Sequence, residues 1–199
     1  HLTLKLENQL LKDCLLNKIF FMAKKNKFID KSIFLYGEIT NTSIMKCIDS
    51  MLEIVEFNEE YENPLDPIKL IINSYGGSVY DGFGLIGMME TSPLQIHTYA
   101  YGQIMSMALP IFTSGKKRFS SPYTTFMYHG IAWDSPYEKL EWHKQEAHEG
   151  DRLQKMYDQI ILKTTKMNKV DMDNIKLTKS EWYFDPKKAI KLGVIDQIL

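Results

Sequence analysis

The stretch Ile68-Lys69-Leu70-Ile71-Ile72-Asn73-Ser74-Tyr75-Gly76-Gly77-Ser78 decides the fold of this chain. Its first half is a short apolar run, which is typical of a buried strand. Gly76 and Gly77 then predict a tight turn with positive φ, a conformation that glycine adopts freely. Apolar residues recur at helical spacing over residues 79–89. The stretch therefore predicts a strand, a turn and a helix in direct succession.

Similar successions of strand and helix fill residues 31–130. Further strands are expected at residues 31–37, 94–100 and 124–128 and around Arg118-Phe119, and a helix capped by Thr42 is expected at residues 41–55. Strands that alternate with helices predict an α/β domain with a largely parallel sheet.

The composition is that of an ordinary soluble globular protein of about one domain. The 199 residues are 44% hydrophobic and 25% charged, and the net charge is −1. This balance gives no indication of binding to nucleic acid or to a membrane. Cys14 and Cys47 have no metal-ligand spacing and favour a reducing compartment. We expect neither a metal nor another cofactor.

Two helical regions are expected beyond the alternating core. Residues 1–30 predict a helical N-terminal extension to a single domain at residues 31–199. Residues of about 137–167 predict one long helix, which would reach roughly 45 Å at 1.5 Å per residue. Its second half has an apolar side made of Leu153, Met156, Tyr157, Ile160 and Ile161. Its length favours an arm that packs against another subunit over a merely solvated surface helix.

Ser106 and His129 are the candidate nucleophile and base. Ser106 follows an expected strand and precedes an apolar, helix-like run. Helix starts leave N–H groups unpaired, so a serine there can attack a carbonyl while nearby amides hold the oxyanion. His129 ends a later apolar strand. The competing interpretations are a helix N-cap for Ser106 and a structural histidine at a strand end, and the shared setting favours catalysis.

Four segments of the chain, in their order and spacing, resemble the family of the Clp protease proteolytic subunit, ClpP. They are residues 33–39 (IFLYGEI), 72–78 (INSYGGS), 102–107 (GQIMSM) and 189–198 (AIKLGVIDQI). The resemblance runs from about residue 32 to residue 199. It implies a crotonase-like ClpP fold, with repeated β-β-α units and a protruding long handle helix at about 137–167.

The resemblance also implies roles for single residues. Ser106 is similar to the family's nucleophile, His129 to its base, and the amides of Gly77 and Met107 to its oxyanion donors. The family's third catalytic residue is an aspartate that lies between the handle helix and the last segment. Four acids of this chain lie in that region: Asp171, Asp173, Glu181 and Asp185. The family's position itself falls on Ile175 or Leu177, depending on the side from which it is aligned, so the chain departs from the pattern here. Glu181 is our expected third member, Asp173 is the alternative, and the lack of any orienting carboxylate stays open.

The chain departs from the family pattern directly after His129. Gly130-Ile131 stands where the family has Gln-Pro, and residues 132–136 replace a glycine-rich strand that lines the substrate cleft. Trp133 therefore has the potential to reshape that cleft.

The expected function is an ATP-independent peptidase subunit of a self-compartmentalised serine endopeptidase that degrades unfolded polypeptides inside an oligomeric chamber. Expected partners are further copies in stacked heptameric rings, or related subunits in a mixed ring, and an AAA+ unfoldase. The expected location is the cytoplasm or an organelle stroma. Three alternatives stay open: a non-catalytic ring subunit, a crotonase-fold enzyme acting on coenzyme A thioesters, and a virus-encoded capsid-maturation protease of the same lineage.

Overall fold

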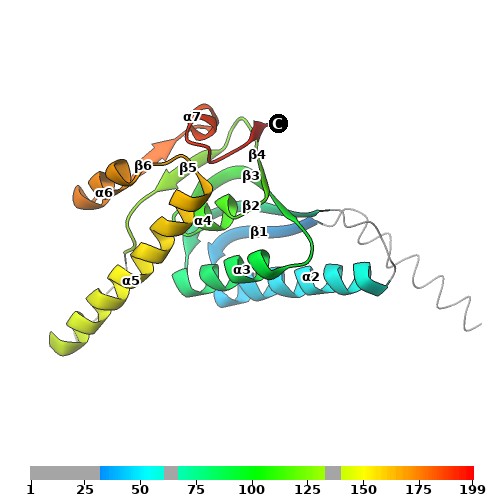
Figure 1. Ribbon diagram of the computed structural model, residues 1–199, viewed down its shortest axis with the longest axis horizontal. Coiled ribbons are helices and arrows are strands. Elements are labelled where there is room, and N and C mark those ends of the chain that lie inside the picture. The colour runs from blue at the N-terminus through cyan, green and yellow to red at the C-terminus, as the bar shows by residue number, and fades with distance from the viewer. Residues whose placement is uncertain (1–31, 61–66, 133–139) are drawn as a thin grey trace, which may run out of the picture. The chain divides into compact units, whose positions relative to one another are not determined.

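Strands and helices alternate along the chain in the computed structural model, which describes residues 32–60, 67–132 and 140–199. The expected extension at residues 1–30 lies outside these residues, as does Trp133. Residues 33–199 form one compact unit. The elements in chain order (Figure 1) are β1 Ser32–Ile39, α2 Asn41–Glu60, β2 Ile68–Gly77, α3 Val79–Thr91, β3 Ile96–Met105, α4 Ala108–Thr113, β4 Lys117–Ser120, β5 Thr125–Tyr128, α5 Leu140–Thr164, α6 Lys169–Leu177, β6 Trp182–Phe184, α7 Pro186–Lys191 and β7 Gln197–Ile198.

The described strands form one sheet in which β3 is the central member. The order along the sheet is β1-β2-β3-β4-β7. The first half of β3 pairs with β4, the second half pairs with β5, and β2 lies along its other edge, all in parallel. The pair of β5 with the short β6 is antiparallel. The predicted α/β domain with a largely parallel sheet is therefore confirmed.

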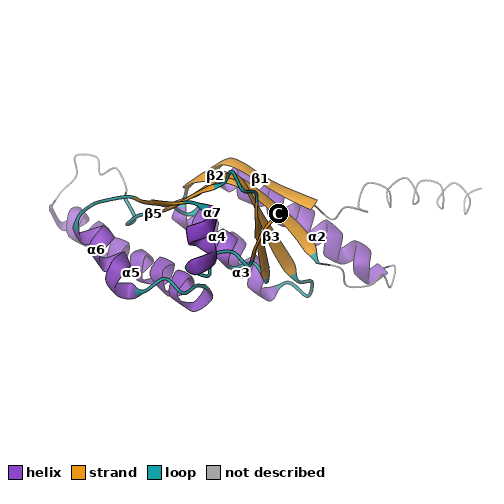
Figure 2. Cartoon of the chain, turned by 90° about the horizontal axis from the view of Figure 1, so that it is seen from above, coloured by secondary structure: helices purple, strands orange, loops and turns teal. Residues whose placement is uncertain are grey.

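Helices α2 and α3 lie side by side on one side of the sheet (Figures 1 and 2). The buried apolar residues of α2 recur at helical spacing, at Ile44, Cys47, Met51 and Ile54. The cap of α2 differs from the prediction. Thr40 Oγ1 accepts a hydrogen bond from the Ser43 amide, and Ser43 Oγ accepts one from the Thr40 amide. This reciprocal pair caps the helix in place of Thr42.

Helix α4 is short and wholly internal. All six of its residues are buried, and it packs against α3, α5, β2 and β3. The ring of Phe112 packs against Phe126 of β5 at a centroid distance of 5.8 Å, and Phe126 stacks on Phe184 of β6 at 5.5 Å. Aromatic burial therefore ties α4 to β5 and β6.

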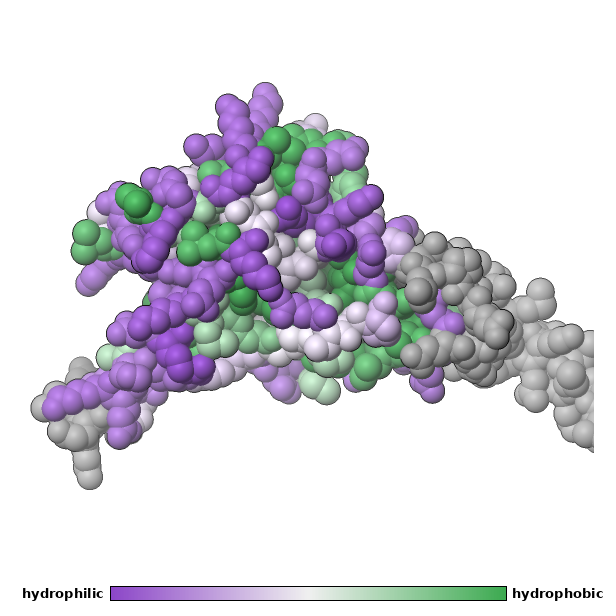
Figure 3. All heavy atoms as spheres, viewed as in Figure 1, coloured by the Kyte–Doolittle hydropathy of each residue, from purple (hydrophilic) through white to green (hydrophobic). Residues whose placement is uncertain are grey.

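Helix α5 is anchored through its second half. Leu153, Tyr157 and Ile161, spaced four residues apart, are buried, whereas most of the described residues before Gly150 are exposed or half-buried and hydrophilic (Figure 3). The carbonyl oxygen of Thr164 accepts a 2.6 Å hydrogen bond from Arg118, which also pairs with Asp196. The long helix is thus confirmed, ending at Thr164 instead of residue 167.

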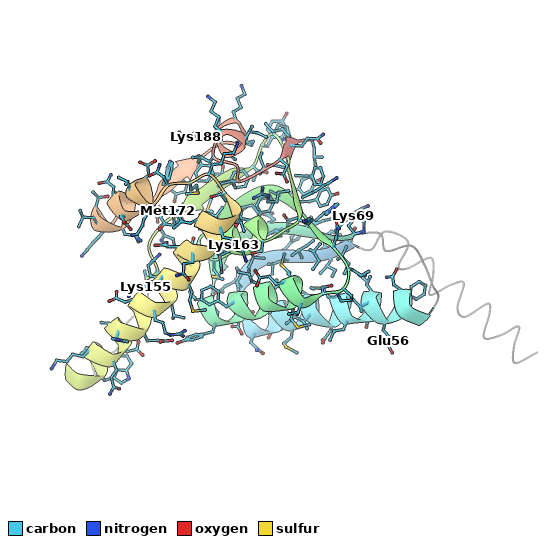
Figure 4. All side chains as sticks on the ribbon, in the orientation of Figure 1. Glu56, Lys69, Lys155, Lys163, Met172 and Lys188 are labelled. Carbon is cyan, nitrogen blue, oxygen red and sulfur yellow. The ribbon has the colours of Figure 1, made fainter. Side chains whose placement is uncertain are left out.

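Helices α5 and α6 lie side by side in Figures 1 and 2. Met172 of α6 is buried, while Lys155 and Lys163 of α5 are exposed (all three labelled in Figure 4).

None of the helices described here is long and apolar enough to cross a membrane.

Candidate active site

Ser106 lies where the sequence predicts, in the turn between β3 and α4. Its φ is +51°, a left-handed conformation that costs a residue other than glycine on the order of 1–3 kcal/mol. The Ser106 amide donates to the carbonyl oxygen of Met127 at 3.2 Å. The Ser106 carbonyl oxygen accepts from the Leu109 amide at 2.9 Å and from the Tyr157 hydroxyl at 3.1 Å. Contacts from β5, α4 and α5 therefore hold this conformation.

The end of β2 lies directly against Ser106. Gly76 has a φ of +104°, and a Cβ atom there would come within 2.5 Å of the Ser106 Cβ atom. The Gly76 amide donates to Ser74 Oγ at 3.1 Å. Gly77 has a φ of +143°, and the next amide, that of Ser78, donates to the carbonyl oxygen of Ile39. Glycine is required here both for its φ and for the close approach of two backbones.

His129 follows β5 and faces Ser106. Its Nε2 atom is 2.7 Å from Ser106 Oγ, a good distance for a hydrogen bond, which the hydroxyl donates in the tautomer whose proton is on Nδ1. Burial lowers the pKa of His129 below its ordinary value, and the negative charge of Glu181 opposes this in part. The imidazole is therefore neutral at pH 7 and able to accept a proton.

Two hollows border this pair. A small pocket of about 40 Å³ is lined by Ser106, His129 and the two expected oxyanion donors, Gly77 and Met107, together with Val79, Ile131, Ala132 and Tyr157. A larger cavity of about 630 Å³ lies beside His129, between α5 and the segment that leads from α6 to β6. Glu181 lines this larger cavity.

Glu181 is near His129 but is hydrogen-bonded elsewhere. Its Oε2 atom accepts a 2.5 Å hydrogen bond from the Tyr183 hydroxyl, and its side chain is exposed. Its charge nevertheless raises the pKa of His129. The other three acids are engaged in or around α6 and α7: Asp173 with Lys169 and Lys176, Asp171 with Asn168, and Asp185 with the Lys188 amide.

Sequence reasoning missed the contacts that α5 makes with the site. Tyr157 was predicted only as part of an apolar side, and its hydroxyl gave no local signal of a bond to Ser106. Gln154 Oε1 accepts a hydrogen bond from the Ile131 amide at 2.6 Å, in the segment that departs from the family pattern. In the part of the chain that the structure describes, no three His, Cys, Asp or Glu side chains are grouped to hold a metal ion.

Gly76→Ala tests the close approach of β2 to Ser106. We expect labelling of Ser106 by a fluorophosphonate to slow at least roughly 100-fold and the protein to lose more than about 1 kcal/mol of unfolding free energy, because the new methyl group collides with Ser106 and strains the backbone. Gly84→Ala in α3 is the matched control, since no atom lies within 4 Å of its Cβ position. Normal labelling of Gly76→Ala would contradict the geometry.

The rate of Ser106 labelling should also depend on pH. Only neutral His129 can accept the serine proton, and a lowered pKa keeps the imidazole neutral to more acidic pH. We therefore expect the rate to fall on acidification with a midpoint below 6.5, the ordinary value for histidine. Labelling rates measured from about pH 4 to 8 give this midpoint. A midpoint above 6.5 would show that burial does not dominate.

Comparison with known proteins supports the fold and the family. The family model "Clp protease" matches residues 20–199. The ATP-dependent Clp protease proteolytic subunit 1 of Prochlorococcus marinus subsp. pastoris is 26% identical over 173 residues, which cover 85% of this chain and 84% of the relative. Subunit 2 of a Synechococcus species is 27% identical over 180 residues, covering 85% and 83%.

A solved structure of a ClpP1 mutant from Listeria monocytogenes superposes with a TM-score of 0.76. It covers 89% of this chain and 95% of that chain at 20% identity, which bears on the fold alone. The expected ClpP fold is therefore confirmed. Because the family model matches nearly the whole length, this chain belongs to the Clp protease family.

Proposed function

We propose that this chain is an ATP-independent peptidase subunit that hydrolyses peptide bonds with Ser106 as nucleophile and His129 as general base. The observation that carries the proposal is the 2.7 Å separation between Ser106 Oγ and His129 Nε2. The serine oxygen attacks the substrate carbonyl carbon while its proton passes to Nε2, and the imidazolium then protonates the leaving amine. Water then attacks the carbonyl carbon of the acyl-enzyme and gives a proton to His129. His129 returns the proton to Ser106 as the peptide acid leaves, which regenerates the free hydroxyl.

The amides of Gly77 and Met107 are our proposed donors to the oxyanion. Both residues line the small pocket that also contains Ser106 and His129. Met107 directly precedes α4, at a helix start where backbone N–H groups have no partner within the helix. Donors that are already in place when charge develops on the substrate oxygen lower the barrier to its formation.

Glu181 is our proposed orienting carboxylate. Two observations support it: it lines the same cavity as His129, and its charge raises the pKa of that imidazole. A carboxylate of this kind holds the base in one tautomer and stabilises the imidazolium. For a direct bond to His129, the side chain has to turn away from Tyr183.

Family membership supports an oligomeric protease with separate subunits for peptide cleavage and for ATP use. The matched relatives are named as proteolytic subunits of an ATP-dependent protease. We infer stacked rings, heptameric or mixed with related subunits, that receive unfolded polypeptides from an AAA+ unfoldase in the cytoplasm or a stroma. The described residues of α5 before Gly150 are exposed or half-buried, which supports contacts between subunits through this half of the helix.

A non-catalytic ring subunit is the second candidate. One observation favours it: the Glu181 carboxylate is bound by Tyr183 instead of His129. Reactivity of Ser106 distinguishes the two functions, because a scaffold has no need of an activated serine.

The decisive experiment compares the wild-type chain with Ser106→Ala. We expect wild-type protein to hydrolyse fluorogenic peptides without added metal and to be labelled by a fluorophosphonate, and we expect Ser106→Ala to do neither. Ser114→Ala, at the opposite end of α4, is the matched control and should behave as wild type. Ring-shaped wild-type protein that is inert to the label and to every peptide would establish the scaffold instead.

Glu181→Gln tests the orienting carboxylate separately. We expect kcat to fall roughly 10- to 1,000-fold, because the imidazolium loses its stabilising charge. The acid midpoint of the rate should also move lower, since Glu181 raises the pKa of His129. Tyr183→Phe keeps the carboxylate and removes its competing donor, so its kcat should not fall. If kcat and midpoint are both unchanged in Glu181→Gln, another group orients the base.

A further inference from the structure

We propose that Asp158 of α5 is a positioning residue for His129, which it holds by a direct bond to Tyr128 on one side and, through Gln154, by a bond to Ile131 on the other. The inference rests on the proposed function, because it assigns Asp158 a task in the Ser106–His129 site. Asp158 is not among the acids that the sequence singles out. Its side chain is only 13% exposed, and three donors from three elements converge on it.

The first of these bonds reaches the residue before His129. The Tyr128 hydroxyl donates to Asp158 Oδ1 at 2.8 Å, and the Tyr128 side chain is completely buried. Burial and the bond to Asp158 both raise the pKa of Tyr128. The phenol is therefore always a donor, and a buried carboxylate is its matching acceptor. This bond fixes the end of β5 against α5.

The second connection reaches the chain two residues after His129. Gln154 lies one turn before Asp158 on α5, and its Nε2 atom donates to Asp158 Oδ1 at 2.8 Å. Its Oε1 atom accepts from the Ile131 amide at 2.6 Å. An amide side chain has a donor end and an acceptor end. Because Asp158 takes the donor end, the acceptor end is directed at Ile131.

The third connection comes from α6 and compensates the buried charge. Lys176 Nζ pairs with Asp158 Oδ2 and also with Asp173 Oδ1 at 2.9 Å. A Cβ atom on Gly130 would lie 3.2 Å from Lys176 Cγ, so the lysine stem borders the residue directly after His129. A buried carboxylate that is paired and fully hydrogen-bonded avoids the cost of an isolated charge.

The cluster therefore touches residues 128, 130 and 131 and leaves His129 to face Ser106. A displacement of about 1 Å in a catalytic group can cost roughly 100-fold in rate. In Asp158→Asn an NH2 group replaces one carboxylate oxygen, so at least one of the three groups that donate to Asp158 (Tyr128, Gln154 and Lys176) loses its acceptor. The positions of Tyr128 and Gln154, and with them that of His129, then become less well defined.

The test compares Asp158→Asn with Asp173→Asn, which removes the more exposed partner of the same lysine. We expect kcat for a fluorogenic peptide, and the rate of fluorophosphonate labelling, to fall about 10- to 100-fold in Asp158→Asn. KM should stay within about 2-fold, because the substrate contacts remain. Asp173→Asn should stay within about 2-fold in both constants. Asp158→Glu, which keeps the carboxylate, should recover part of kcat.

Tyr128→Phe provides the second variant, because it deletes one hydroxyl and keeps the ring. If Asp158→Asn does not fold, Tyr128→Phe decides. A reduced kcat of Tyr128→Phe with native circular dichroism supports the inference, and an unchanged kcat of Tyr128→Phe overturns it. A folded Asp158→Asn with wild-type kcat, or an equal loss in Asp173→Asn, also overturns it and leaves the proposed function intact. If wild-type Ser106 resists the label altogether, the proposed function fails and the inference fails with it.

Discussion

The rest of the site depends on one constraint, the close contact between the end of β2 and the residue that follows β3. Gly76 lies so close to Ser106 that no side chain fits between them. This contact brings Gly77 and the serine hydroxyl to one pocket. Ser106 beside Gly76 has a left-handed backbone, which bonds to Met127 and Tyr157 stabilise. Strain at the serine is thus offset by ordinary hydrogen bonds around it.

His129 depends on a different part of the same sheet. It directly follows β5, which pairs in parallel with β3 and antiparallel with β6. The stacked rings of Phe126 and Phe184 fix these strands in the core. The hydroxyl and the imidazole therefore come from the ends of two paired strands, and their short separation follows from strand pairing more than from the conformation of a long loop. A rigid support of this kind suits chemistry that needs a precise distance.

Local signals predicted the elements from β1 to α5 and the Ser106–His129 pair, but they gave no assignment for α6, β6, α7 or β7. Apolar periodicity and Gly76-Gly77 are properties of neighbouring residues, so β2, α3 and the turn at Ser106 could be anticipated. The hydrogen-bond partners of Glu181 and Asp158 could not be anticipated in this way. Asp158 is a charged residue next to Tyr157 on an amphipathic helix, so the sequence alone indicates a solvated position. Its partners at residues 128 and 176 are adjacent to it only in the folded chain. The cap of α2 was misplaced by two residues, since Thr40 and Thr42 both suit that position.

Helix α5 is anchored in the core directly beside the site, where Tyr157 bonds to Ser106. From Leu140 to Leu153 it extends about 20 Å at 1.5 Å per residue, and from Leu153 to Ile161 it is anchored in the core. Where the helix moves as one body, a tilt of its first half also moves the turn that carries Tyr157, in the opposite sense and with smaller amplitude. A molecule that binds the Leu140 end of α5 therefore has a mechanical route to the small pocket beside Ser106.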